Sequence, residues 1–317
     1  MKWYRTLGRA VLMATMILST CVPASVQAAA PNPAVLTLRL PSPDNATPPG
    51  PNGTVHFIGT ATVLIHYQGF TILTDPNFLH KGEDVHLGYG ITSERLTNPA
   101  LGLEQLPPVD LVLLSHFHED HFDKLVQEKL DKNIPIVTTK EAAAHLKRIG
   151  FKRTFGLATW DRIDVEKGEA RLRISAAPGR HGKAGMQLLL PPVMGAVLDF
   201  GPNLAAPSQR MYISGDTLIY DDLKAIPQRF PDVDLALLHL GGTRILGVFK
   251  VTMDGKDGVK LMQIVQPKKA IPIHFDDYDV FKSPLSDFAR EVKDAGLEQQ
   301  VVFLAHGDTY TFTPSER

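Results

Sequence analysis

Residues 111–121 read LVLLSHFHEDH, an apolar run that leads directly into three histidines and two acids. Four apolar side chains in a row are typical of a short strand buried on both faces. Imidazole and carboxylate groups crowded into six residues are costly to bury without a partner, and both are metal ligands. The stretch therefore predicts a metal site that begins where the strand ends. Its candidate ligands are His116, His118, Asp120 and His121.

Three further predicted strands also lead to a histidine or an aspartate. Residues 171–176 precede His181, residues 211–214 precede Asp216, and residues 270–273 precede His274. In layered α/β folds, ligands bind beyond the carboxyl ends of the strands, so we expect these side chains to converge. Seven such groups are too many for one tetrahedral ion, and they suit two ions that share one carboxylate.

The rest of the chain alternates short apolar runs with helical patterns, which indicates α/β layers. Residues 76–108 have weak periodicity and are expected to form a long loop over the site. The other expected strands are residues 55–58, 61–67, 70–74, 196–200, 235–238 and 301–304, and the expected helices are residues 141–149, 258–265 and 284–295.

The composition is that of a folded protein. The 317 residues are 44% hydrophobic and 21% charged, which excludes a disordered chain and a multispanning membrane protein. Lys and Arg number 33 against 34 Asp and Glu, so no basic excess points to nucleic acid. Cys21 stands alone, which excludes an intramolecular disulfide and zinc-finger spacing. Gly-x-Ser-x-Gly and phosphate-binding glycine motifs are absent.

Residues 1–28 resemble a signal peptide. Three basic residues precede a short apolar core at residues 10–17, and small residues at Val26 and Ala28 suit cleavage. A buried N-terminal helix is one alternative, and a lipoprotein signal processed at Cys21 is another. We expect an exported protein, periplasmic or secreted, with no stable membrane span after cleavage. Its oligomeric state cannot be deduced from the sequence.

Residues 29–53 contain seven prolines and are expected to form an extended lead-in without regular strands. Ordered structure is expected to begin near Thr54, so residues 54–317 would form one domain.

The pattern His-x-His-x-Asp-His, followed by an isolated His, a Ser-Gly-Asp-Thr and a late His, resembles the metallo-β-lactamase superfamily over about residues 54–313. The resemblance implies a four-layer αββα sandwich of two mixed sheets flanked by helices. It also implies the role of each donor. His116, His118 and His181 would hold a first metal, Asp120, His121 and His274 a second, Asp216 would bridge them, and Asp75 would orient a ligand histidine.

Residues 58–65, 73–76 and 272–274 are most similar to the branch of L-ascorbate-6-phosphate lactonase and N-acyl-phosphatidylethanolamine phospholipase D. The chain departs from both enzymes at Thr60 and around residues 252–254, so their substrates do not transfer. It also lacks the cysteine ligand of many true β-lactamases.

The resemblance implies hydrolysis by a hydroxide that two divalent ions activate, with zinc favoured and manganese or iron also suited to these ligands. The bond would belong to an ester, lactone, amide or phosphodiester in a small-molecule or lipid-like substrate. Asp120 would handle the proton. His239 follows residues 235–238 and is predicted to contact substrate or support the metals.

Two other functions remain open. One is a dinuclear-metal protein with a redox or non-catalytic role, and the other is a phosphodiesterase or nuclease of the same superfamily. Several further residues are weaker candidates for the walls of the pocket: His80, His86, Tyr89, Arg244, Tyr278 and Phe281.

Overall fold

The computed structural model describes residues 36–42, 50–88, 90–183, 185, 190–245 and 248–314. They belong to a compact unit that spans residues 35–317. The predicted signal peptide lies outside the described residues. Among the residues that are described, no helix is both long and apolar enough to cross a membrane.

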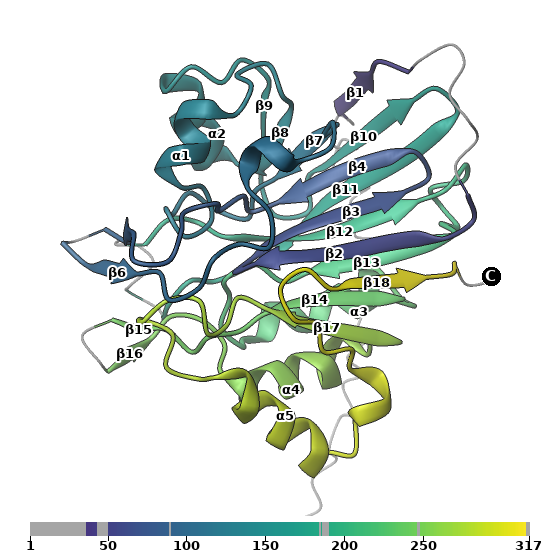
Figure 1. The fold of residues 1–317 in the computed structure, drawn as a ribbon. Coiled ribbons are helices and arrows are strands. Elements are labelled where there is room, and N and C mark those ends of the chain that lie inside the picture. Colours follow the sequence, from purple (N-terminus) through teal and green to yellow (C-terminus); the bar gives the residue numbers. More distant parts are fainter. Residues whose placement is uncertain are drawn as a thin grey trace, which may run out of the picture. The chain divides into compact units, whose positions relative to one another are not determined.

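Two seven-stranded sheets form the centre of this unit (Figure 1). The first sheet has the order β1 (Leu36–Leu40), β10 (Arg162–Lys167), β11 (Ala170–Pro178), β12 (Met194–Phe200), β13 (Gln209–Ile213), β14 (Leu235–His239) and β17 (Lys269–Ile273). The second has the order β18 (Thr309–Phe312), β2 (Gly53–Gly59), β3 (Thr62–Tyr67), β4 (Phe70–Thr74), β7 (Leu111–Leu113), β8 (Ile136–Thr139) and β9 (Thr154–Leu157).

Strand direction explains where the functional side chains gather. In the second sheet β4, β7, β8 and β9 run parallel, and in the first sheet β13, β14 and β17 run parallel. Parallel neighbours end at the same edge of a sheet, so the residues that follow β4 and β7 lie together, as do those that follow β13 and β17.

Strand residues alternate between two apolar cores. In β7, Leu111 and Leu113 face the core between the sheets, whereas Val112 faces the core under the helices. This two-sided burial is what the continuous apolar run predicts. The central core draws on both sheets, and each outer core joins one sheet to its helices.

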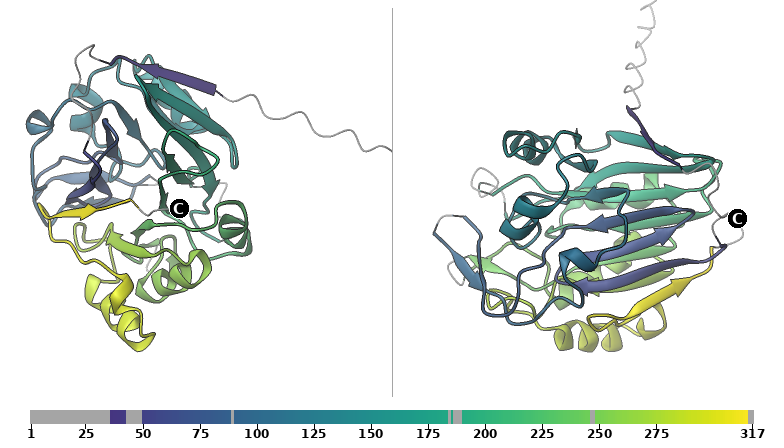
Figure 2. Two further views of the ribbon diagram at one scale, coloured as in Figure 1. Left: turned by 90° about the vertical axis from the view of Figure 1, so that its right-hand side faces the viewer. Right: turned by 45° about the horizontal axis from the view of Figure 1, so that its top comes forward.

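Helices cover the outer face of each sheet (Figure 2). α1 (Lys124–Lys129) and α2 (Lys140–Arg148) pack on the second sheet. α3 (Ala225–Arg229), α4 (Gly255–Val265) and α5 (Leu285–Asp294) pack on the first. The expected αββα sandwich is confirmed.

Two small hairpins form separate two-stranded sheets. The first pairs β5 (Asp84–His86) with β6 (Thr92–Glu94), and the second pairs β15 (Arg244–Ile245) with β16 (Phe249–Lys250). The first lies in the segment that we expected to be a loop. Three 3-10 turns complete the described elements: η1 (Leu103–Gln105), η3 (Asp221–Lys224) and η4 (Glu298–Gln300).

Two expectations are wrong. Strand β1 lies inside the proline-rich lead-in and pairs parallel with β10 from Leu36 to Leu40. None of the prolines falls within these five residues, so the ladder is intact, and Leu38 and Leu40 are buried. The expected strand at residues 301–304 is only a single bridge between Ala270 and Val301.

Candidate metal centre

The loop between β7 and α1 carries four of the predicted donors. The His118 carbonyl accepts hydrogen bonds from the backbone N–H of His121 at 3.0 Å and of Phe122 at 2.8 Å. This tight turn brings Asp120 and His121 back beside His116. The His116 and His121 rings have centroids 4.2 Å apart. One short segment therefore presents imidazole and carboxylate groups side by side, as its sequence predicts.

The other three donors follow strands of the first sheet. His181 follows β11, Asp216 follows β13 and His274 follows β17. Gly215, just before Asp216, has φ +60°, and a Cβ there would lie 2.8 Å from the Met194 carbonyl oxygen and 3.2 Å from Cβ of Ser115. Only glycine fits such an approach, which explains the glycine of the Ser-Gly-Asp-Thr motif.

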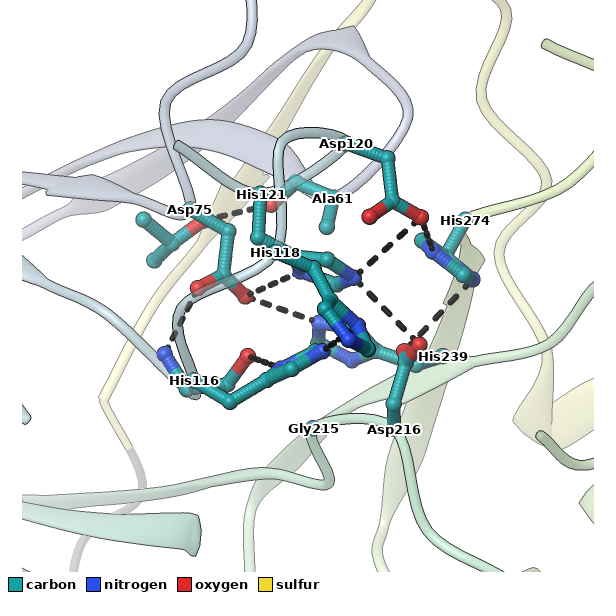
Figure 3. A network of polar contacts seen from close by, with 12 residues as sticks. Ala61, Asp75, His116, His118, Asp120, His121, Gly215, Asp216, His239 and His274 are labelled. Carbon is teal, nitrogen blue, oxygen red and sulfur yellow. Dashed lines mark hydrogen bonds and ion pairs between the residues drawn. The ribbon is translucent and has the colours of Figure 1, made fainter. Parts of the chain in front are cut away.

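The seven donors form two groups that could each hold a metal ion, with the ligand atoms of a group within 4.8 Å of one another. Figure 3 labels the donors other than His181. His116, His118 and His181 make the first group, and Asp120, His121, Asp216 and His274 make the second. Each group joins residues from both sheets. The structure thus brings together every donor that the sequence predicts.

Hydrogen bonds fix the orientation of the rings. Nδ1 of His181 lies 2.8 Å from the Val251 carbonyl oxygen, and Nδ1 of His274 lies 3.1 Å from that of Leu240. A carbonyl oxygen only accepts, so each Nδ1 carries the proton and each Nε2 keeps its lone pair for a metal. In both rings the backbone selects the tautomer that can bind a cation.

The buried carboxylate of Asp75 contacts two histidine rings behind the metal donors. Its Oδ2 lies 3.4 Å from Nδ1 of His121 and 3.1 Å from Nε2 of His239, and its Oδ1 accepts from the Ser115 N–H at 2.6 Å. Burial acts to raise the pKa of Asp75, but the hydrogen bonds from the two histidines lower it to about 2. The carboxylate therefore stays ionised and orients His121, which is the placement that the resemblance implies.

Several buried polar atoms of the second group lack a hydrogen-bond partner among the described residues: Asp120 Oδ1, His121 Nε2, Asp216 Oδ1 and His274 Nε2. Buried polar atoms are rarely left unsatisfied in native proteins, and a bound ion is one way to satisfy them. These donor types and orphaned atoms fit divalent metal ions.

Electrostatics support the same conclusion. Burial lowers the pKa of His116 well below its usual value and that of His118 to about 3, so both imidazoles are neutral and able to bind metal. Burial also acts to lower the pKa of His121 and His274, but Asp216 and Asp120 raise it above the usual value. These two rings therefore attract a proton that a metal ion would replace.

His239 is not placed as a residue that contacts substrate. Its side chain is fully buried, its Nε2 faces Asp75, and its backbone N–H donates to Ser214 Oγ at 2.9 Å. It does not belong to the lining of the cavity above the donors. The predicted contact between His239 and substrate is therefore corrected: His239 lies behind Asp75 and outside the cavity lining.

A cavity opens above both donor groups. Its lining residues are His118, Asp120, His181 and Asp216 at the floor, and Leu87, Ile91, Leu190, Thr243, Arg244, Ile245, Val251 and Val280 on the walls. Arg244 lies there as predicted. Thr243 was missed, although it follows the glycine pair at residues 241–242.

The remaining wall candidates lie elsewhere. Tyr278 is buried against Asn77, and Phe281 packs on the His274 ring at 4.4 Å. His80 and His86 are exposed and outside the cavity lining, and Tyr89 lies outside the described residues.

Asp277, three residues after the donor His274, is fully buried. It accepts hydrogen bonds from the Thr60 N–H at 2.6 Å and from Thr97, and lies 3.2 Å from His306 Nε2. The Thr60 carbonyl in turn accepts from the His274 N–H at 2.5 Å. Asp277 thus braces the backbone that carries a metal donor.

The fold and the two donor groups define an αββα sandwich with a metal centre at one edge of its sheets. Residues 71–275 match the family described as the beta-lactamase superfamily domain. The chain therefore belongs to the metallo-β-lactamase superfamily.

Several curated relatives are named UPF0173 metal-dependent hydrolases. The chain is 28% identical to a UPF0173 metal-dependent hydrolase of Nanoarchaeum equitans over 204 residues, which cover 63% of this chain and 85% of the relative. It is 29% identical to one of Thermus thermophilus over 249 residues, which cover 77% and 93% of the two chains.

Solved structures share the fold. An isothiocyanate hydrolase from Delia radicum gut bacteria has a TM-score of 0.69 at 22% identity, covering 82% of this chain and 99% of that one. The diiron β-hydroxylase CmlA of Streptomyces venezuelae has a TM-score of 0.58 at 16% identity, covering 84% and 55%.

Proposed function

We propose that the chain is an exported metal-dependent hydrolase that uses two divalent cations to cleave an ester, lactone, amide or phosphodiester bond. The observation that carries this proposal is the meeting of two His/Asp donor groups on the floor of one open cavity. The names of the curated relatives support the reaction class.

His116, His118 and His181 would hold one cation, and Asp120, His121 and His274 the other, with Asp216 between them. Cations held there would polarise the substrate oxygen and lower the pKa of a bound water, with zinc favoured by the ligand types. Asp120 lines the cavity, and its Oδ1 makes no hydrogen bond with the other described residues. That oxygen is free to take a proton from the attacking water and pass it to the leaving group.

The walls support a small-molecule or lipid-like substrate. Six of the lining side chains are aliphatic, so the part of the substrate away from the scissile bond would be apolar. Basic and acidic side chains are nearly equal in number, so the charge of the chain gives no support to a nucleic-acid partner.

Export rests on residues 1–28, whose basic start, short apolar core and small residues suit a signal peptide. Fractionation of cells that express the full chain tests this part. We expect a mature N-terminus near residue 29 outside the cytoplasm, and an intact N-terminus in the cytoplasm would contradict export.

A second candidate function is redox chemistry at a dinuclear centre. It is supported by the fold shared with a diiron β-hydroxylase. The histidine-rich first group argues for hydrolysis instead, because imidazole ligands suit zinc well.

The test is an activity screen of the metal-loaded protein on esters, lactones, phosphodiesters and N-acyl amides. Chelator-treated protein is the control, and metal content is measured on the same samples. We expect about two ions per chain and hydrolysis that chelation abolishes. One ion or none, or oxygen consumption without hydrolysis, would overturn the proposal.

A further inference from the structure

Two wall residues of the cavity are neither aliphatic nor metal donors. Thr243 and Arg244 lie side by side where β14 has ended and β15 begins, and both line the cavity. Every other wall residue in the described lining is apolar. Polar groups in an apolar ligand pocket usually set the orientation and specificity of the ligand.

The Thr243 hydroxyl is uncommitted. The residue is 8% exposed, and its Oγ1 is buried without a hydrogen-bond partner among the described residues. Its backbone is fixed, because its N–H donates to Thr252 Oγ1 at 2.8 Å and its carbonyl accepts from the Val251 N–H at 2.9 Å. A buried hydroxyl without a partner costs free energy, so a ligand oxygen that reaches it would relieve that cost.

The Arg244 charge is also unmatched. Among the described residues its guanidinium hydrogen-bonds only to the Val248 carbonyl, through Nη1 at 3.5 Å, and no carboxylate lies within 4.0 Å of it. Lys250, directly opposite in the hairpin, is matched by Asp254 at 2.6 Å. Two like charges face each other there, and only one has an acidic partner within the protein.

Two of the three acids that line an adjoining groove are already engaged, and the third, Glu291, lies more than 4.0 Å from the Arg244 guanidinium. Arg244 also borders a polar groove that contains Asp254 and Asp287. Asp254 binds Lys250, and Asp287 binds Arg290 at 2.9 Å. An arginine that has no acidic partner and lies at the rim of an apolar cavity is arranged to receive an anion from outside the protein.

We propose that Arg244 and Thr243 form an oxyanion subsite, which selects substrates that carry a carboxylate or phosphate group at the end of a short apolar chain. The planar guanidinium binds either group through two parallel hydrogen bonds. The aliphatic walls contact the chain between this anion and the bond to be cleaved. This inference rests on the proposed hydrolase function and names the substrate class of the same site.

Matched esters test the subsite. Mono-4-nitrophenyl glutarate carries the carboxylate, 4-nitrophenyl pentanoate is its neutral analogue, and 4-nitrophenyl 4-phosphonobutanoate replaces the carboxylate with a phosphonate. We expect the metal-loaded protein to prefer the two anionic esters in kcat/KM. The ratio between them identifies which anion the site favours.

Arg244→Gln should raise KM for the anionic esters about ten- to hundredfold, the range of a charge-assisted hydrogen bond, and leave the neutral ester within about twofold. Arg244→Lys should recover part of the loss. Thr243→Val should raise KM for the anionic esters severalfold, and Thr243→Ser should leave that KM unchanged. Arg148→Gln removes an exposed charge on α2, outside the cavity lining, and is the matched control.

The subsite would be overturned if Arg244→Gln lowered kcat/KM equally for neutral and anionic esters. It would also be overturned if the unaltered protein showed no preference for the anionic esters. A readout without turnover separates it from the proposed function. Calorimetry with 4-phenylbutyrate and 4-phenylbutanol should show tighter binding of the acid, and Arg244→Gln should weaken it about tenfold or more with metal content unchanged. Such binding without hydrolysis of any ester would overturn only the hydrolase function. Equal binding of acid and alcohol would overturn the subsite.

Discussion

The floor and the wall of the cavity are built in opposite ways. On the floor, buried imidazoles and carboxylates are held by fixed partners such as the Leu240 and Val251 carbonyls and Asp75. The wall consists largely of aliphatic side chains on two short hairpins, with the Arg244 guanidinium at its exposed rim. We therefore propose that the floor sets the reaction and that the wall sets which substrate enters. Substitutions on the floor should abolish chemistry, and those on the wall should change selectivity.

The largest effect is expected from Asp216→Ala. Asp216 belongs to the second donor group and lines the cavity, so its loss should remove metal and activity together. Metal analysis and turnover on the best substrate measure this. Asp221→Ala, on the exposed η3 turn, is the control. Activity that survives in the Asp216 variant would contradict the bridging role.

A smaller loss is expected from Asp75→Ala, which removes the partner of His121 but no donor. Loss of such an orienting group typically lowers metal affinity about 10- to 100-fold. Metal titration against a competing chelator measures the change.

His239→Gln should keep metal and alter turnover less than Asp75→Ala does, because His239 acts through Asp75. If turnover is unchanged in His239→Gln, His239 has only a packing role.

Asp277→Asn should destabilise the fold in a pH-dependent way. Burial acts to raise the pKa of Asp277, but hydrogen bonds with His306 and Thr97, the His306 charge and the Arg95 charge lower it below its usual value. A lowered pKa contributes stability above the unfolded pKa of about 3.9, and that stability is lost as pH falls through the folded value.

The Asp277→Asn variant should therefore be less stable than the original protein near pH 7, by about 1–3 kcal/mol, with a difference that narrows below about pH 4. Urea unfolding across pH measures it. His306 Nε2 faces the carboxylate at 3.2 Å, so His306→Gln is run in parallel. A difference that is constant with pH would show that the ionised form of Asp277 is not what matters.

The smallest effect is expected from Ile91→Ala on the wall. It removes apolar contact with the substrate but touches no donor, so KM should rise about three- to tenfold with kcat and metal content retained. Leu96→Ala, an exposed leucine outside the cavity lining, should leave KM unchanged. A fall in kcat for Ile91→Ala would show that wall and floor are not separable.

The sequence predicts the floor well because its signals are local. Three histidines and an aspartate fall within six residues, and each later donor lies within five residues of the end of a predicted strand. The apolar runs predict α/β layers, and the resemblance to the metallo-β-lactamase superfamily implies their αββα order. What the sequence misses depends on contacts between distant segments. Asp277 resembles a turn residue until Thr60 and Thr97 fold against it, and Thr243 has no pattern of its own.

Misjudged strands have similar causes. The high proline content of the lead-in hides β1, because the pairing with β10 depends on the proline-free residues 36–40. Residues 301–304 have strand-like composition, but only Val301 finds a bridging partner. Apolar composition indicates that a segment can pair, and the available sheet edge decides whether it does.

Each donor group draws residues from both sheets, and this has a thermodynamic consequence. A bound ion would stabilise the packing of one sheet on the other, because its ligands come together only when both sheets are folded against each other. Ligands that bind only the folded chain raise its melting temperature in proportion to the logarithm of their free concentration. Chelation would therefore lower the melting temperature of the whole sandwich, so that heat resistance would depend on the supply of metal.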